Sequence, residues 1–239
     1  PSCKGRNGSV NLATLALAVL AAAAPADSVV MRLPETVITG TRLTYPALRA
    51  PVAYSVVDRT QFASGRQISL AEALSGVPGL FAQSRGGGQD VRITIRGFGA
   101  RGNGERSNSG NMRGIRVITD GIPISDPDGR TSLDLVDLGA VNHIEVSRSN
   151  ASALYGNASG GVIHLFSDLD FASSFVRYEQ RAGGFGFHRE QGVLGFAAGP
   201  TRGTFSLSST AFAGWRQHSQ SDATVAQLRL SSPLSDRGR

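Results

Sequence analysis

The run from residue 144 to residue 163 constrains the fold more than any other part of this chain. It begins with an alternating strand pattern (Ile-Glu-Val-Ser-Arg), then turns at Ser149 and Asn150 into a single turn of helix. A glycine-rich break (156–161) follows, and a second strand starts directly after it. Signals this closely spaced leave no room for a long helix, so the run predicts a domain of short, mixed elements.

The segments before this run fit the same kind of domain. Residues 52–58 alternate as a strand, and residues 89–96 place Val91, Ile93 and Ile95 on one face of a half-buried strand. Residues 116–119 read as a further strand closed by an Asp-Gly turn. We therefore predict an α+β domain that ends near residue 167.

Two short helices are expected within this domain. Ser69 and Glu72 have the spacing of a capping box, and Gly76 and Pro78 soon end the helix that it opens. Residues 132–138 could form the second short helix, ahead of a strand over 142–147.

From about residue 172 the pattern changes to weakly alternating segments separated by glycine-rich turns. These segments cover residues 172–181, 204–215 and 223–230. Stretches of about ten residues with a period of two are typical of membrane β-barrel strands, but a soluble β-sandwich would look similar.

The N-terminus has the features of an exported protein. Lys4 and Arg6 precede an apolar run (10–24) that ends in Ala-Pro-Ala at residues 24–26. A positive start, a short apolar run and a small-residue site predict a secretory signal peptide over residues 1–26. Cys3, the only cysteine, precedes the apolar run, which excludes a disulfide framework and a cysteine metal site from the mature chain.

Charge and motif spacing argue against several other functions. The net charge is +6, but Lys4 is the only lysine and the arginines are scattered singly, which does not favour nucleic-acid binding. Residues 97–102 fit G-x-G-x-x-G, yet no helical pattern follows to hold a pyrophosphate. The four histidines lack the spacing of metal ligands. We therefore predict no catalytic residues, no metal site, no cofactor and no enzymatic activity.

The 144–163 run, together with Ile-Arg-Gly-Phe at 95–98 and Asp-Gly-Ile-Pro at 120–123, resembles the plug domain of TonB-dependent outer-membrane receptors. The resemblance covers roughly residues 35–167. It implies a periplasmic energy-coupling segment over 27–45, a plug domain over 46–167 and the first strands of an incomplete transmembrane β-barrel over 168–239. The expected fold is thus an α+β plug of short strands and helices followed by the start of an antiparallel barrel, which in this family has about 22 strands.

The resemblance also implies roles for particular residues. A TonB box would be captured by the periplasmic partner TonB as an added strand, and it would consist of Glu35, Thr36, Val37, Ile38, Thr39 and Gly40. Arg96 and Arg148 stand where plug arginines pair with acidic residues of the barrel wall, an arrangement that can act as a releasable latch. The family often has Arg-Gly-Pro where this chain has Arg148-Ser149-Asn150, and either Ser149 or Asn150 can cap the next helix instead.

The arginine-bearing loop over residues 97–114 has two interpretations. It is either a solvated loop or an exposed tip at which Arg101, Arg106 and Arg113 meet an anionic ligand.

The expected function is that of the N-terminal portion of a TonB-dependent outer-membrane transporter. Its plug would gate the uptake of an iron chelate or a similar scarce nutrient, with TonB, the outer membrane and a small-molecule ligand as partners and no nucleic acid. A free-standing periplasmic plug-like binding module is the alternative, and an exported adhesin or structural β protein is a third reading. Because about ten residues per strand allow roughly four to six strands after residue 167, too few to close a barrel, we expect the chain to be a fragment of such a receptor.

Overall fold

The computed structural model describes residues 37–38, 45–46, 52–84, 91–99, 112–125, 131–134, 136–167, 169 and 171–233. The predicted signal peptide lies outside the described residues, as do four residues of the predicted TonB box and two of the loop arginines: Glu35, Thr36, Thr39, Gly40, Arg101 and Arg106. The other two TonB-box residues form strand β1 (Val37–Ile38), which pairs antiparallel with β2 (Tyr45–Pro46). Within the described part of the chain, no helix is long and apolar enough to cross a membrane.

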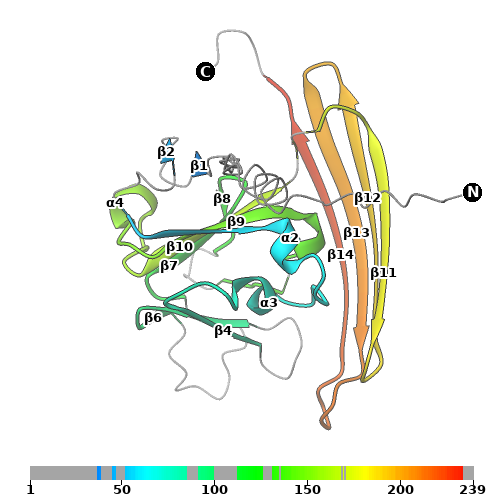
Figure 1. Ribbon diagram of the computed structural model, residues 1–239, viewed down its shortest axis with the longest axis horizontal. Helices are drawn as coiled ribbons and strands as arrows, with labels where there is room; N and C mark the ends of the chain where they lie inside the picture. The colour runs from blue at the N-terminus through cyan, green and yellow to red at the C-terminus, as the bar shows by residue number, and fades with distance from the viewer. Residues whose placement is uncertain are drawn as a thin grey trace, which may run out of the picture. The chain divides into compact units, whose positions relative to one another are not determined.

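Residues between 52 and 167 form an α+β domain with two sheets (Figure 1). The larger sheet has the strand order β3-β9-β10-β7-β8, in which only β10 and β7 are parallel. The smaller sheet has the antiparallel order β4-β5-β6. The strands are β3 (Tyr54–Asp58), β4 (Leu80–Ser84), β5 (Val91–Ile95), β6 (Phe98–Gly99), β7 (Ile115–Thr119), β8 (Ile122–Pro123), β9 (Val141–Ser147) and β10 (Gly161–Ser167). The helical elements are α2 (Arg59–Phe62), α3 (Leu70–Leu74), the 3-10 turn η2 (Leu138–Ala140) and α4 (Ser152–Tyr155).

One apolar core joins the two sheets of this domain. Strand β5 buries Val91, Ile93 and Ile95 and leaves the alternate residues partly exposed, so the predicted half-buried strand is confirmed. The same core takes Leu74 from α3 and Ile144 from β9. Strands of five to seven residues can therefore persist because each contributes its apolar face to a shared interior.

The two predicted helix signals are only partly confirmed. Helix α3 begins after Ser69, but the Ser69 side chain makes no capping hydrogen bond. The carboxylate of Glu72 instead accepts a hydrogen bond from the backbone N–H of Gln67 (2.9 Å), because Gln67 has a left-handed φ of 57° that turns the chain back. The expected helix over 132–138 was wrong: the described residues of this segment contribute only the start of the 3-10 turn η2, where the Asp137 carboxylate accepts a hydrogen bond from the N–H of Gly139 (3.0 Å).

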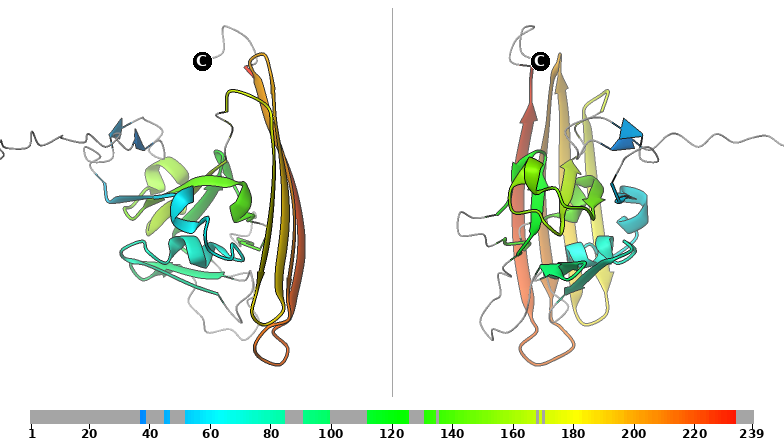
Figure 2. Two further views of the ribbon diagram at one scale, coloured as in Figure 1. Left: turned by 45° about the vertical axis from the view of Figure 1, so that its right-hand side comes forward. Right: turned by 90° about the vertical axis from the view of Figure 1, so that its left-hand side faces the viewer.

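The residues after 171 form a four-stranded antiparallel sheet, which we call the C-terminal sheet. Its strands are β11 (Phe175–Gly183), β12 (Phe187–Ala198), β13 (Thr201–Phe212) and β14 (Ser221–Ser231), in sequential order. Their pairing register has no shift over its whole length, and Figure 2 shows one continuous, curved layer. The predicted fold, a plug-like α+β domain followed by the start of an antiparallel barrel, is confirmed. Among the described strands, β11 and β14 are the edges of this sheet, so these four strands do not close into a barrel.

Candidate functional site: the interface between the α+β domain and the C-terminal sheet

The C-terminal sheet has the opposite polarity to a sheet of a water-soluble protein. Its exposed face carries a band of large apolar side chains: Val176, Tyr178, Leu194, Phe196, Phe205, Leu207, Leu228 and Leu230. Its buried face carries polar ones: Arg189, Gln191, Ser206, Ser208 and Thr210. Strict alternation puts the two sets on opposite faces of the same strands. Such an arrangement is typical of strands with lipid on one side and a polar interior on the other.

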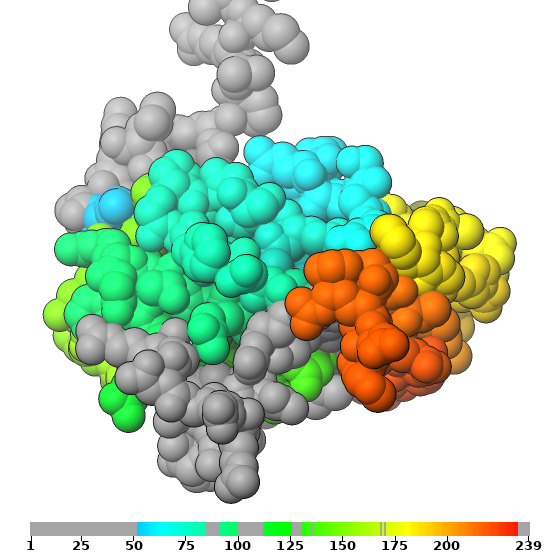
Figure 3. Space-filling model, turned by 90° about the horizontal axis from the view of Figure 1, so that it is seen from below, coloured from blue at the N-terminus to red at the C-terminus, as the bar shows by residue number. Residues whose placement is uncertain are grey.

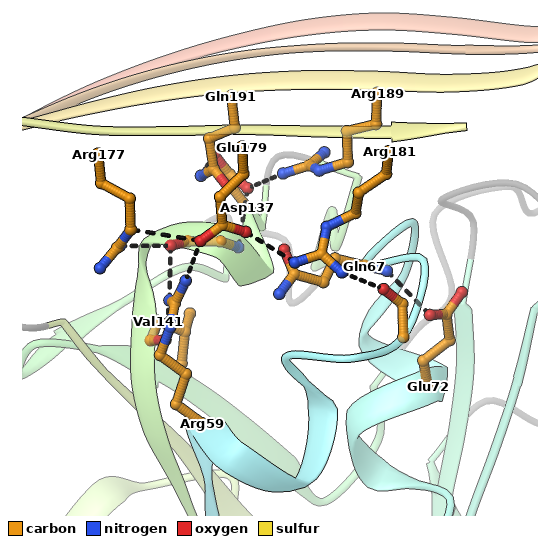
Figure 4. Close-up of polar contacts among 12 residues, drawn as sticks. Arg59, Gln67, Glu72, Asp137, Val141, Arg177, Glu179, Arg181, Arg189 and Gln191 are labelled. Atoms are coloured by element: carbon orange, nitrogen blue, oxygen red, sulfur yellow. Dashed lines mark hydrogen bonds and ion pairs between the residues drawn. The ribbon is translucent and has the colours of Figure 1, made fainter.

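Arg59, the first residue of α2, connects the α+β domain to this buried face. One guanidinium nitrogen donates to the carbonyl oxygens of Gly139 (2.8 Å) and Val141 (3.2 Å). The other donates to the carboxylate of Glu179 on β11 (3.1 Å). Figure 4 shows the side chain of Arg59 reaching past Val141 towards Glu179 of the sheet. One cation therefore fixes α2 both to its own domain and to the C-terminal sheet.

Glu179 gathers three arginines around one carboxylate. Besides Arg59, the side chains of Arg177 (3.4 Å) and Arg181 (2.7 Å) of the same strand contact it. Arg181 also donates to the carbonyl oxygen of Gly65 in the α+β domain (2.6 Å). Charge-assisted bonds of this kind are stronger than neutral ones, and here the donors come from both sides of the interface.

Asp137 makes the reciprocal contact, with the acid on the α+β domain and the base on the sheet. Its wholly buried carboxylate pairs with Arg189 of β12 and accepts a hydrogen bond from the amide of Gln191 (3.1 Å). Arg189 in turn donates to the hydroxyl of Thr210 on β13 (2.7 Å). The Nε of Arg189 has no hydrogen-bond partner among the described residues, but the pair persists because separating either partner leaves an uncompensated buried charge.

An apolar contact lies beside these polar ones. Ile68 of the α+β domain packs with Phe187 of β12 and Phe212 of β13, and all three side chains are buried. In Figure 3 the cyan surface of the α2 region meets the yellow and orange ends of the sheet. We call the combined contacts the anchor, made by Arg59, Gly65, Ile68 and Asp137 with Glu179, Arg181, Phe187, Arg189, Gln191 and Phe212.

The contact with β14 is more open than the anchor. Arg229 pairs with Asp120 at 2.8 Å, and Asp120 also accepts hydrogen bonds from the backbone N–H and hydroxyl of Ser167. Next to this pair lies a cavity of about 330 Å³, with Gln227 and Arg229 on the sheet side and Asp137 and Leu165 on the other.

Several buried titratable groups lie within the larger sheet of the α+β domain. Burial, reinforced by the nearby carboxylate of Glu145, raises the pKa of Tyr54 to about 12. Burial lowers the pKa of His164, although Glu145 opposes that shift. His164 is therefore held neutral near pH 7, and its ring packs edge-on against Tyr155.

The predicted latch residues Arg96 and Arg148 lie close together, and both guanidinium groups bond to backbone carbonyl oxygens. Arg148 donates to the carbonyl oxygens of Pro78 (2.8 Å) and Tyr54 (3.2 Å), and Arg96 donates to the carbonyl oxygen of Arg148 (2.9 Å). Among the described residues, neither arginine forms an ion pair with a carboxylate. Their pairing with acidic residues of a barrel wall stays a prediction.

The three loop arginines cannot be compared as a set, because only Arg113 is described. Its side chain is exposed, and its carbonyl oxygen accepts a hydrogen bond from the N–H of Gly99 (2.8 Å). Both interpretations of the 97–114 loop therefore stay open.

Sequence reasoning missed every residue of the anchor. One signal was available on β11, where Arg177, Glu179 and Arg181 alternate with Val176 and Tyr178 and so mark a charged face. No comparable signal marked Arg59 or Asp137, since neither lies on an alternating charged face: Arg59 directly follows Asp58, and Asp137 lies three positions after Asp134.

Comparison with known proteins relates this chain to a protein family. A family model described as "TonB-dependent Receptor Plug Domain" matches residues 46–162. The iron-regulated outer membrane virulence protein of Vibrio cholerae is 33% identical over 171 residues, which cover 66% of this chain and 24% of that protein. The vitamin B12 transporter of Vibrio vulnificus is 27% identical over 133 residues, or 55% of this chain and 20% of the transporter. This chain thus spans about a quarter or less of the length of these relatives.

A solved structure gives the same result for the fold. The pyoverdine outer membrane receptor of Pseudomonas aeruginosa PAO1, bound to pyoverdine, superposes with a TM-score of 0.66 at 19% identity. The match covers 81% of this chain and 27% of the receptor, so it includes more than the α+β domain alone.

Proposed function

This chain belongs to the TonB-dependent receptors through its plug domain, and from that premise we propose that it forms the gate and the first wall strands of an outer-membrane transporter. In this proposal residues 1–26 are a signal peptide, residues 27–45 couple the gate to TonB, residues 46–167 are the plug and residues 168–239 begin the barrel. One relative is named as a vitamin B12 transporter and one similar structure as a pyoverdine receptor, which supports transport rather than catalysis.

The observation that carries this proposal is the reversed polarity of the C-terminal sheet. The band of large apolar side chains faces outward, whereas the polar face holds the plug domain through the anchor. Apolar side chains that face lipid are favourable, but the same band would be costly in water. The reversed polarity therefore favours an outer-membrane location and disfavours a free-standing periplasmic module.

The cargo that we propose is a ferric chelate or a similarly scarce nutrient. Support comes from the relatives, one of which is named for iron regulation, one for vitamin B12 and one for pyoverdine. The loop over residues 97–114, with Arg101, Arg106 and Arg113, is the part of this chain that we propose to meet an anionic cargo.

Energy coupling is assigned to the segment from Glu35 to Gly40, which TonB would capture as an added strand. Substituting Ile38→Pro in the complete receptor removes a backbone donor from that strand, whereas Ile38→Val keeps it. We expect Ile38→Pro to reduce uptake of a radiolabelled ferric chelate at least about 10-fold while surface binding of the chelate stays unchanged, because binding does not need coupling. Normal uptake by Ile38→Pro would refute the assignment of the TonB box.

A further inference from the structure

We propose that the cavity between β14 and the α+β domain binds a small organic acid, whose carboxylate meets Arg229 and whose apolar part packs against the plug. None of the lining residues belongs to the 97–114 loop, to which we assign the cargo. Binding at this cavity needs neither TonB nor a chelate. The receptor would therefore have a second ligand site that is independent of its cargo.

The cavity has the size and the lining of a small-molecule site. Its volume is about 330 Å³, at the lower end of the range for ligand pockets, about 300–1,000 Å³. One part of the lining is apolar and consists of Ile124, Val136, Val141 and Leu165. The other part is polar and consists of Thr119, Ser132, Asp137, Gln227 and Arg229. Apolar walls with a few polar groups are typical of pockets that fix one end of a ligand.

Arg229 is the cation of this lining. Its side chain is 18% exposed, and its Nε contacts the carboxylate of Asp120 at 2.8 Å. Asp120 also accepts hydrogen bonds from the backbone N–H (2.7 Å) and the hydroxyl (2.6 Å) of Ser167, which fix its position. Among the described residues, the two terminal nitrogens of Arg229 form no further hydrogen bond or ion pair. They are a planar pair of donors of the kind that binds a carboxylate.

Two hydroxyl groups add donors to the same cavity. Thr119 lies at the end of β7, and Ser132 lies in the segment before η2. Within the described part of the chain, neither hydroxyl forms a hydrogen bond. Donors on the plug and a cation on β14 would therefore face the same ligand from both sides of the boundary.

The charges around the cavity favour an anion. Among the described strands of the C-terminal sheet, the inward positions hold five arginines but a single acid, Glu179. The arginines are Arg177, Arg181, Arg189, Arg202 and Arg229. Asp137 also lines the cavity, but its carboxylate already accepts from Gly139, Arg189 and Gln191. The cation that has donors left is thus Arg229.

The apolar part of the lining favours an organic acid over inorganic phosphate. A ring or a short hydrocarbon stem would cover Val136 and Leu165, whereas a phosphate ion would leave both in contact with water. A ligand held in this way touches β14 and the plug at once. Because it binds only when the two regions are together, it stabilises their contact.

Benzoate is a suitable ligand for the test, and benzamide is its neutral counterpart of nearly the same shape. Both are titrated calorimetrically into the complete receptor in detergent, without TonB or cargo. We expect benzoate to bind at least about 10-fold more tightly than benzamide, since only the carboxylate forms charge-assisted bonds to Arg229. Equal binding of the two, or tighter binding of inorganic phosphate, would overturn the proposal.

Three variants place the binding in this cavity. Arg229→Gln removes the cation, and Val136→Phe fills the cavity while it keeps the Arg229–Asp120 pair. We expect each to weaken benzoate binding at least about 10-fold. Arg202→Gln is the control, because Arg202 is an inward arginine of the same sheet that bonds to carbonyl oxygens and does not line the cavity. It should bind benzoate as the wild type does.

Unchanged affinity in Val136→Phe would overturn the site even if Arg229→Gln failed to fold, and so would an equal loss in Arg202→Gln. The result is separate from the test of transport. Absent benzoate binding would leave the uptake of a ferric chelate unaffected, and normal uptake by Ile38→Pro would leave benzoate binding unaffected.

Discussion

Strands β5 and β12 have the same alternating pattern but bury different sets of side chains: β5 buries only apolar ones, whereas β12 buries Arg189 and Gln191 along with Phe187 and Val193. Strand β5 turns Val91, Ile93 and Ile95 into the plug core, whereas β12 turns Arg189 and Gln191 inward and leaves Leu194 and Phe196 exposed. The difference teaches that alternation fixes two faces but not which face is buried. Which face is buried depends on what packs against it: a second apolar layer covers β5, and the polar surface of the plug covers one side of β12.

The largest expected effect comes from removing the carboxylate of Asp137, which pairs with Arg189 on the polar face of β12. Asp137→Ala leaves Arg189 buried without its partner, and we expect a loss of about 3–5 kcal/mol in the free energy of unfolding of the plug in the complete receptor. Asp134→Ala, an exposed carboxylate nearby, is the matched control and should change stability by less than about 0.5 kcal/mol. Chemical denaturation in detergent, followed by plug fluorescence from an attached dye, measures both. Equal stability of the two variants would refute the role given to the buried pair.

The outward face of β12 offers the second test. Leu194→Arg places a charge where we propose that lipid lies, and we expect it to cost about 2–4 kcal/mol of folding free energy in a bilayer. Ser209→Arg on β13 lies on the same outward face beyond the apolar band and should cost about 0–1 kcal/mol. Reversible folding of the complete receptor into lipid vesicles gives both values. A tolerated Leu194→Arg would mean that water, not lipid, covers the band.

The third test weakens the anchor without removing a side chain. Glu179→Gln keeps the size of the group but loses the charge that gathers Arg59, Arg177 and Arg181. We expect a loss of about 1.5–3 kcal/mol in the free energy of unfolding, the range for hydrogen bonds to a charged group. Glu190→Gln on the outward face of β12 is the control, since its partner is the exposed His188. Thermal unfolding of the two variants in detergent compares them, and a similar midpoint would contradict the anchor.

The smallest expected effect is a pH dependence within the plug. Burial lowers the pKa of His164, so the unfolded chain binds a proton more readily than the folded one. The contribution of neutral His164 to the free energy of unfolding is then fully present above the ordinary histidine pKa of about 6.5. It is lost as the pH falls below that value. The variant His164→Phe should flatten the stability profile between pH 6.5 and pH 5 and leave it unchanged at pH 8. An equally steep profile in the variant would assign the acid sensitivity to other groups.

Much of the fold could be predicted because its signals are local. The alternation of residues 89–96 and the glycine-rich break after residue 155 identify short strands whatever surrounds them. The helix expected over 132–138 does not form, because an Asp side chain favours a cap or a turn over the interior of a helix. The carboxylate of Asp137 bonds to η2 and to Arg189 instead. The capping box expected at Ser69 and Glu72 does not form for a similar reason. The left-handed turn at Gln67 presents its N–H to the carboxylate of Glu72, which accepts that hydrogen bond instead.

The sequence by itself determined the family of the plug and the two-faced strands that follow it, because both depend on motifs and on a period of two. Only the tertiary structure decided which charges meet across the two regions. Arg59 and Glu179 are 120 positions apart, and Asp137 and Arg189 are 52 apart. Pairing over such distances follows from how the plug packs on the sheet, and no local pattern encodes it. For the same reason Arg148 bonds to carbonyl oxygens within the plug, while Arg59 at the end of β3 holds the plug to its first wall strands.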